Sequence, residues 1–187
     1  MTSADSPTPT SRPAAAPGAA QPSVPGWTPP SPRQRKAILD RSRSIAVVGA
    51  SSNPARASNF VMTYLKSSSC DFDLYPVHPG ETEILGLPVF RSLAEVTDAI
   101  GRPIDIVDVF RKADDCPAVA AEAASVEART LWLQLGLWSV EAAKIALTAG
   151  LDVVMNRCTK IEHARFAGGL HLAGFDTGVI SSRRGPA

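Results

Sequence analysis

Short apolar segments alternate with segments of helical periodicity along most of this chain, and that alternation restricts the folds that it can adopt. The apolar segments lie at 44–49, 73–77, 105–110, 130–135 and 152–156, and a shorter one lies at 87–90. Strands that are apolar on both faces are typical of a parallel sheet whose crossover helices cover both sides. The sequence therefore predicts an α/β fold, namely a doubly wound, Rossmann-like domain of three layers with a mostly parallel sheet.

The segments between these strands carry the signals of amphipathic helices and of their ends. We expect helices at 32–43, 58–66, 92–100, 114–128, 139–149 and 158–166. Pro32 suits a first helical turn, and Ser139 is a typical N-cap, with Gly150 at the other end of its helix. Ser92 followed by Glu95 predicts a capping box.

Composition divides the chain into three parts. Residues 1–32 contain nine prolines and cannot bury enough apolar surface to offset the entropy of ordering, so we expect a disordered tail from which only Trp27 docks on the domain. The folded domain is expected at 33–167. Residues 168–187 are rich in glycine yet too apolar for a free tail, and we expect them to pack on the domain or on a second subunit.

Charge and cysteine content exclude several classes of function. The 187 residues carry a formal net charge of +1, which attracts neither nucleic acid nor a membrane surface, and no apolar run approaches the length of a membrane span. The three cysteines and three histidines show no metal-ligand spacing, and the cysteines form no disulfide framework. We expect a cytoplasmic protein with no secretory signal, metal or nucleic-acid partner, and a homo-oligomer is compatible with the sequence.

In a doubly wound sheet the ligand lies beyond the carboxyl ends of the strands, at the point where the strand order reverses. That rule selects the residues that follow the predicted strands, and their polar character favours a lined cleft over ordinary turns. They are Gly49, Ser51, Ser52, Asn53, His78, Arg111, Gln134, Gly136, Asn156, Arg157 and Cys158.

The segment after the first predicted strand has the features of an anion-binding loop. Ser51, Ser52 and Ser58 offer hydroxyl groups, a helix N-terminus follows, and Arg56 adds a charge-assisted contact. A plain turn with capping serines is the alternative interpretation.

Two of the usual signals of an NAD site are missing. The loop lacks the second and third glycines of G-x-G-x-x-G, and no acidic residue ends the second strand, since Glu81 and Glu83 lie beyond a turn. His78 stands there instead and, as a cation, suits the additional phosphate of NADP or of coenzyme A. A residue in a surface turn is the alternative for His78.

Six sequence blocks, taken in order, resemble the small stand-alone CoA-binding proteins of bacteria, whose domain is similar to the CoA-binding domain of the succinyl-CoA synthetase alpha subunit. The blocks are VVGASSNPAR (47–56), LYPVHP (74–79), ILGLPVFRSLAEV (84–96), DIVDVFR (105–111), LWLQLG (131–136) and VVMNRCTKIEHAR (153–165). The resemblance implies coenzyme A or an acyl-CoA as ligand. We expect no ligase activity, since nothing in the chain corresponds to the phosphorylated-histidine domain or to the beta subunit of the synthetase.

By position, the resemblance also implies which part of the ligand each residue serves. The phosphates are expected at Ser51, Ser52, Asn53, Arg56 and Ser58. The adenosine is expected between Val77 and His78, with Phe110 and Arg111 lining the cleft. The pantetheine is expected near Gln134 and Gly136, and the far side is closed by Asn156, Arg157 and Cys158.

Cys158 is the candidate for a reactive side chain. It stands at the predicted start of the last helix beside Arg157, with Lys160 downstream, and helix N-termini and cations lower the pKa of a thiol. Exchange with a CoA disulfide, or acyl transfer, is the resulting hypothesis. We favour the alternative that Cys158 is a small residue packed under the ligand, because no base is assigned to activate it.

Binding of CoA or acyl-CoA without catalysis is therefore the leading interpretation of the sequence. The alternatives are an NADP-dependent oxidoreductase, a thiol or acyl-transfer enzyme that uses Cys158, and an interaction module without a ligand.

Overall fold

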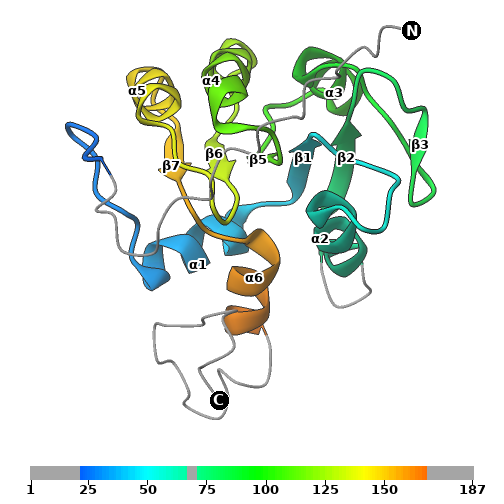
Figure 1. Ribbon diagram of the computed structural model, residues 1–187, viewed down its shortest axis with the longest axis horizontal. Coiled ribbons are helices and arrows are strands. Elements are labelled where there is room, and N and C mark those ends of the chain that lie inside the picture. The colour runs from blue at the N-terminus through cyan, green and yellow to red at the C-terminus, as the bar shows by residue number, and fades with distance from the viewer. Residues whose placement is uncertain (1–21, 67–70, 168–187) are drawn as a thin grey trace, which may run out of the picture.

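The computed structural model describes residues 22–66 and 71–167, and these residues contain a five-stranded parallel sheet (Figure 1). The strands, in the order in which they pair, are β2 (Asp73–Val77), β1 (Ser44–Val48), β5 (Ile106–Val109), β6 (Thr130–Leu133) and β7 (Asp152–Val154). All pairings between these strands are parallel. The strand order reverses between β1 and β5: after β1 the chain continues to β2 at one edge, and after β5 it continues to β6 and β7 at the other.

Helices cover both faces of the sheet, which confirms the predicted three-layer α/β fold (Figure 1). One face carries α3 (Leu93–Ile100), α4 (Cys116–Ser125) and α5 (Val140–Thr148), and the other carries α1 (Pro32–Arg41), α2 (Ala57–Leu65) and α6 (Thr159–Ala167). In β1, Ala46 and Val48 pack with the first set, whereas Ile45 and Val47 pack with the second. Both faces of this strand are buried, which explains its apolar sequence.

Two elements differ from the predicted ones. The strand expected at 87–90 is an antiparallel hairpin of β3 (Glu83–Ile84) and β4 (Leu87–Pro88), separate from the main sheet, and beyond it Phe90 forms an isolated bridge with Val77. The helix expected at 114–128 begins as the 3-10 turn η1 (Ala113–Asp115) and becomes α-helical only at Cys116, with Pro117 in the first turn of α4. Proline suits that turn because the first helical N–H groups have no partner within the helix.

The predicted N-cap serines are confirmed, but the predicted capping box is wrong. Ser92 and Ser139 each accept a hydrogen bond from the backbone N–H three residues later, at 3.2 Å. The Glu95 carboxylate accepts from the N–H of Arg91 at 2.7 Å instead of reaching back to that of Ser92. Because Arg91 precedes the cap, this bond ties α3 to the segment before it.

Residues 22–31, which fall within the predicted disordered tail, lie against the domain. Val24 is buried in the same core as α4 and α5, and the Trp27 ring packs edge-on to Trp138, with ring centroids 5.5 Å apart. The Trp27 Nε1 donates to the Val153 carbonyl at 3.0 Å, and the Trp138 Nε1 donates to the Pro22 carbonyl at 3.2 Å. The expected docking of Trp27 is therefore observed, together with neighbouring residues. The predictions for residues 1–21 and 168–187 lie outside the described residues.

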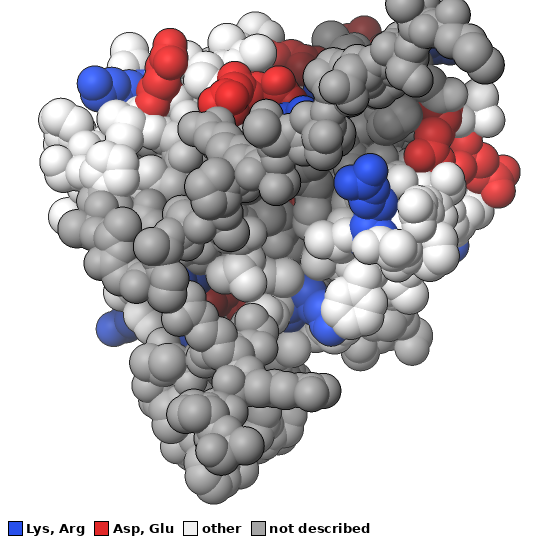
Figure 2. Space-filling view, in the orientation of Figure 1, with Lys and Arg blue, Asp and Glu red and all other residues white. Residues whose placement is uncertain are grey.

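Basic and acidic side chains are interspersed over the face shown in Figure 2, and the described residues form no extended basic surface there. Within 22–66 and 71–167, no helix has both the length and the apolar composition that crossing a membrane requires. Nor do three or more His, Cys, Asp or Glu side chains gather in these ranges as a metal site requires.

Trp27→Ala is expected to lower the free energy of unfolding by about 2 kcal/mol, because it removes a half-buried ring and a hydrogen bond to Val153. Trp27→Phe should cost less, since the contact with Trp138 survives. Chemical denaturation followed by circular dichroism measures both. Equal stability of the three proteins would show that the docked segment contributes nothing to the fold.

Candidate functional site

A cleft of about 630 Å³ opens at the carboxyl edge of the sheet, beyond the ends of β1 and β5. The chain continues from β1 into α2 on one face and from β5 toward α4 on the other, so the two loops separate and leave space between them. Nine of the predicted site residues line this cleft, namely Gly49, Ser51, Arg56, Ser58, His78, Phe110, Arg111, Gln134 and Cys158.

Gly49 allows the ends of β1 and β5 to meet at the base of the cleft. Its φ of +84° is a left-handed conformation, and a Cβ at this position would lie 2.5 Å from the Phe110 carbonyl oxygen. The Gly49 N–H donates to the Val77 carbonyl at 3.1 Å, and the Phe110 N–H donates to the Val48 carbonyl at 2.8 Å. Glycine is therefore needed here for the packing of the strand ends themselves.

The loop after β1 is held by its own side chains and by Asn59 of α2. The Ser51 hydroxyl accepts from the Asn53 N–H at 3.2 Å, and the Asn59 side chain donates to the carbonyls of Ser51 and Ser52 at 2.9 and 3.2 Å. The Asn53 side chain accepts a hydrogen bond within this turn and so stabilises it. Like Ser52, Asn53 lies outside the lining of the cleft. Asn59 was not among the predicted site residues, since it stands within a helix and carries no motif.

A carboxylate reaches this loop, although Glu81 was expected to lie apart from the strand ends. The Ser52 N–H donates to both Glu81 carboxylate oxygens, at 3.1 and 3.0 Å, and hydrogen bonding from Ser52 holds the pKa of Glu81 below its ordinary value. His78 organises the turn that brings Glu81 back, because its Nδ1 accepts from the N–H groups of Gly80 and Glu81, each at 3.1 Å.

The same two hydrogen bonds also set how His78 lines the cleft. Because Nδ1 accepts within the turn, Nε2 is the ring nitrogen that can donate a hydrogen bond to a ligand. The contact of His78 with a phosphate, which the sequence suggests, stays a prediction.

Behind the cleft lining, in contact with Gln134, lies a buried carboxylate that was not among the predicted site residues. Asp108 of β5 is fully buried, and its two oxygens accept from the Gln134 Nε2 at 2.6 Å and from the Thr159 hydroxyl at 2.9 Å. The Gln134 Nε2 also donates to the Thr159 oxygen at 2.8 Å, which closes the network. Burial raises the pKa of Asp108 to about 7, because it outweighs the lowering by these two hydrogen bonds. The only sequence signal was an acidic residue within an apolar strand.

Burial works against the hypothesised activation of Cys158. Cys158 lines the cleft at the start of α6, but burial raises the pKa of its thiol above the ordinary value, and the Asp108 charge acts in the same direction. Hydrogen bonds from the N–H groups of Ile161 and Lys160 lower that pKa by less than burial raises it. The thiol therefore stays protonated near neutral pH and is a poor nucleophile.

Val77, Gly136, Asn156 and Arg157 also lie outside the lining of the cleft, and their contacts support the strand ends. The Val77 carbonyl accepts from Gly49, as described above. Asn156, with a φ of +56°, accepts from the Gly136 N–H at 2.8 Å and so ties the loop after β6 to the loop after β7. The Arg157 carbonyl accepts from Trp132 Nε1 at 2.7 Å.

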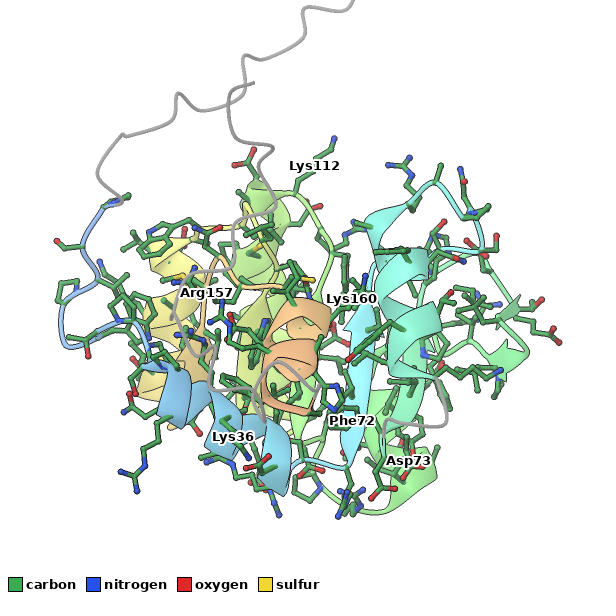
Figure 3. All side chains as sticks on the ribbon, turned by 90° about the horizontal axis from the view of Figure 1, so that it is seen from below. Lys36, Phe72, Asp73, Lys112, Arg157 and Lys160 are labelled. Carbon is green, nitrogen blue, oxygen red and sulfur yellow. The ribbon has the colours of Figure 1, made fainter. Side chains whose placement is uncertain are left out.

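Apolar residues complete the lining, and these were not predicted as site residues. They are Ala50, Ala57, Phe60, Val61, Leu135 and Leu137. Phe60 is 59% exposed and Leu135 is 53% exposed, although both side chains are apolar. Lys160 extends from α6 toward α2, on the other side of α6 from Arg157 (Figure 3), and its Nζ lies 3.8 Å from the Phe60 ring centroid. From apolar periodicity alone, such residues are assigned to a hydrophobic core. No sequence pattern therefore indicated that they line a cleft.

Residues 43–164 match the family described as CoA binding domain. The chain belongs to this CoA-binding family. It is 38% identical over 135 residues to the uncharacterized protein YneT of Bacillus subtilis (strain 168), across 72% of this chain and 96% of YneT. The family predicted from the sequence blocks is thus confirmed.

Solved structures agree with this assignment. A hypothetical protein from Pyrococcus horikoshii OT3 matches with a TM-score of 0.67 and 35% identity, over 80% of this chain and 99% of that chain. The dinucleotide-forming acetyl-coenzyme A synthetase 1 of Ca. Korarchaeum cryptofilum matches with a TM-score of 0.55 and 20% identity, over 65% of this chain and 27% of that chain. The second likeness shows that the fold recurs within a larger protein.

The raised pKa of Asp108 predicts a contribution to the free energy of unfolding that decreases as pH rises. In the folded domain it keeps its proton up to about pH 7, whereas its ordinary pKa is 3.8. The raised pKa favours the folded state below about pH 4, and this contribution is lost as pH rises through 7. Each pKa unit of difference corresponds to about 1.4 kcal/mol.

Asp108→Asn is therefore expected to raise the Tm by several degrees at pH 8 and to change it much less at pH 5, as measured by scanning calorimetry. The exposed Asp98 of α3 provides the matched control, and Asp98→Asn should show no such dependence on pH. A lower Tm for Asp108→Asn at pH 8 would mean that the hydrogen bonds of the carboxylate outweigh the cost of burying its charge.

Proposed function

We propose that the cleft binds coenzyme A or an acyl-CoA, with its phosphates at the loop after β1 and its pantetheine arm extending toward β6. The observation that carries this proposal is the position of the cleft. In a chain of the CoA-binding family, the cleft opens beyond the ends of β1 and β5, where a doubly wound sheet binds its ligand.

The end of the cleft at β1 suits phosphate. α2 begins at Ala57, so the first N–H groups of this helix and the positive end of its dipole lie at the loop. Ser51 and Ser58 line the cleft beside them, and the exposed Arg56 offers a charge-assisted hydrogen bond. Arg111, from the end of β5, adds a second guanidinium to the lining.

The end of the cleft at β6 suits an uncharged chain. Neighbouring strands are about 4.8 Å apart, so β6, two strands from β1, lies about 10 Å from the phosphate loop. Leu135, Leu137 and Cys158 supply apolar contacts there, and Gln134 supplies an amide. Pantetheine combines aliphatic groups with amides and matches this lining. His78, at the end of β2, then lies where the adenosine would contact it.

We favour binding over catalysis because the candidate nucleophile is not activated. The Cys158 thiol is protonated near neutral pH for the reasons given above. Part of the chain is 33% identical over 81 residues to a protein named trans-feruloyl-CoA synthase, but the match covers only 11% of that protein. So small a share fits a common ligand-binding region better than a common activity.

Isothermal titration calorimetry with CoA, acetyl-CoA and NADP tests the proposal. Arg56→Ala is expected to weaken CoA binding about fivefold to tenfold, because it removes a charge-assisted hydrogen bond to phosphate. Arg33→Ala, which removes an exposed arginine of α1 outside the cleft lining, is the control and should leave the affinity unchanged. Tighter binding of NADP than of CoA, or an equal loss in both variants, would refute the proposed site.

Glu81 should oppose binding, because its carboxylate occupies the Ser52 N–H and adds a negative charge beside the phosphate loop. Glu81→Gln is expected to tighten CoA binding about twofold to fivefold, the range typical of an exposed charge interaction. Glu83→Gln, at the exposed residue of β3, is the matched control. If Glu81→Gln weakens binding instead, then Glu81 organises the loop more than it competes with phosphate.

A further inference from the structure

Asp108 occupies a buried position in the sheet, where an ionised carboxylate is costly. It lies in the central strand β5, with Val47 of β1 and Trp132 of β6 as its register partners, and its side chain is fully buried. Within the described residues no cation pairs with it, and its pKa is set by burial and by Gln134 and Thr159. A buried, unpaired charge is costly. We therefore expect Asp108 to have a role beyond packing.

The hydrogen bonds around Asp108 leave one polar atom of the Gln134 side chain available. Both N–H bonds of the carboxamide are used, one to Asp108 and one to Thr159. The carbonyl oxygen Oε1 accepts from no described residue and is not among the buried polar atoms that lack a partner. Oε1 therefore keeps some exposure although Gln134 is only 5% exposed, and Gln134 is exposed where it lines the cleft.

The network also fixes which way the carboxamide faces. The Thr159 hydroxyl donates its only proton to Asp108, so turning the amide over would set Oε1 against an oxygen that has no proton to donate. It would also remove the donor that Thr159 now accepts from. Gln134 is therefore held with its acceptor toward the cleft.

We propose that Asp108 and Thr159 are positioning residues that hold the Oε1 of Gln134 toward the cleft, where it accepts a hydrogen bond from an amide N–H of the pantetheine arm. This inference rests on the proposed function. Gln134 directly follows β6, about 10 Å from the loop that would hold the phosphates, so it meets a part of the ligand beyond them. An oriented acceptor at this end also disfavours phosphate there and so helps to set the direction of the ligand.

The test compares CoA with adenosine 3′,5′-bisphosphate, which lacks the pantetheine arm, by isothermal titration calorimetry. Gln134→Met, Asp108→Asn and Thr159→Val are each expected to weaken CoA binding about three- to tenfold, the value of one hydrogen bond. None of them should change the affinity for the bisphosphate. Thr159→Ser keeps the hydroxyl and should restore CoA binding.

Thr130→Val is the matched control for Thr159→Val. Thr130 is also fully buried, lies at the opposite end of β6, and has a hydroxyl without a partner in the described structure. Its replacement should leave the affinity for both ligands unchanged. The Gln134 side-chain NH₂ resonances give a readout that needs no ligand, since losing the Thr159 acceptor should shift one of the two protons in the NMR spectrum.

The outcomes separate this inference from the function on which it rests. If the wild-type protein binds neither CoA nor the bisphosphate, the proposed function fails and the inference fails with it. If it binds CoA and the Asp108 and Thr159 variants bind CoA equally well, only the inference is overturned. The same holds if the variants lose affinity for both ligands to the same extent, because that result reports a general distortion of the cleft.

Discussion

The close approach of β1 and β5 at their carboxyl ends is the contact on which the site depends. The two strands stay paired up to Gly49, whose missing side chain lets the Phe110 carbonyl come within a distance that no Cβ could accept. Beyond this point the chain turns to opposite faces of the sheet, into α2 on one side and toward α4 on the other. The cleft is therefore a consequence of strand order, and Gly49 fixes where it begins.

The two ends of the cleft differ because helix N-termini behave differently in water and in the protein interior. At α2 the first turn and Arg56 are exposed, so the N–H groups and the dipole can attract an anion. At α6 the N–H groups of Lys160 and Ile161 act on Cys158, yet burial raises the pKa of its thiol by more than they lower it. A helix N-terminus thus favours anion binding at α2, whereas at α6 it leaves the thiol of Cys158 neutral.

The sheet and its helices could be predicted because they follow from periodicity in single segments, as in β1, where alternate residues pack on opposite faces. The cleft could be predicted because strand ends in a parallel sheet share one edge. The partners of Glu81 and Trp27 could not be predicted, since each lies in a distant segment: Ser52 for Glu81, and Val153 for Trp27. The direction in which the pKa of Cys158 is shifted could not be predicted, because a sequence shows neighbouring charges but not the extent of burial.

Burial raises the pKa of Asp108 as it raises that of Cys158. Cys158 lines the cleft and Asp108 lies behind Gln134 of the lining, and both groups have a raised pKa. This end of the cleft therefore tends toward neutrality, whereas Arg56 and Arg111 make the phosphate end cationic. A neutral end suits the uncharged part of a ligand and disfavours a thiolate nucleophile. A carboxyl group that is costly to ionise in a central strand, yet is hydrogen-bonded to the amide of Gln134, is then better explained by ligand recognition than by folding.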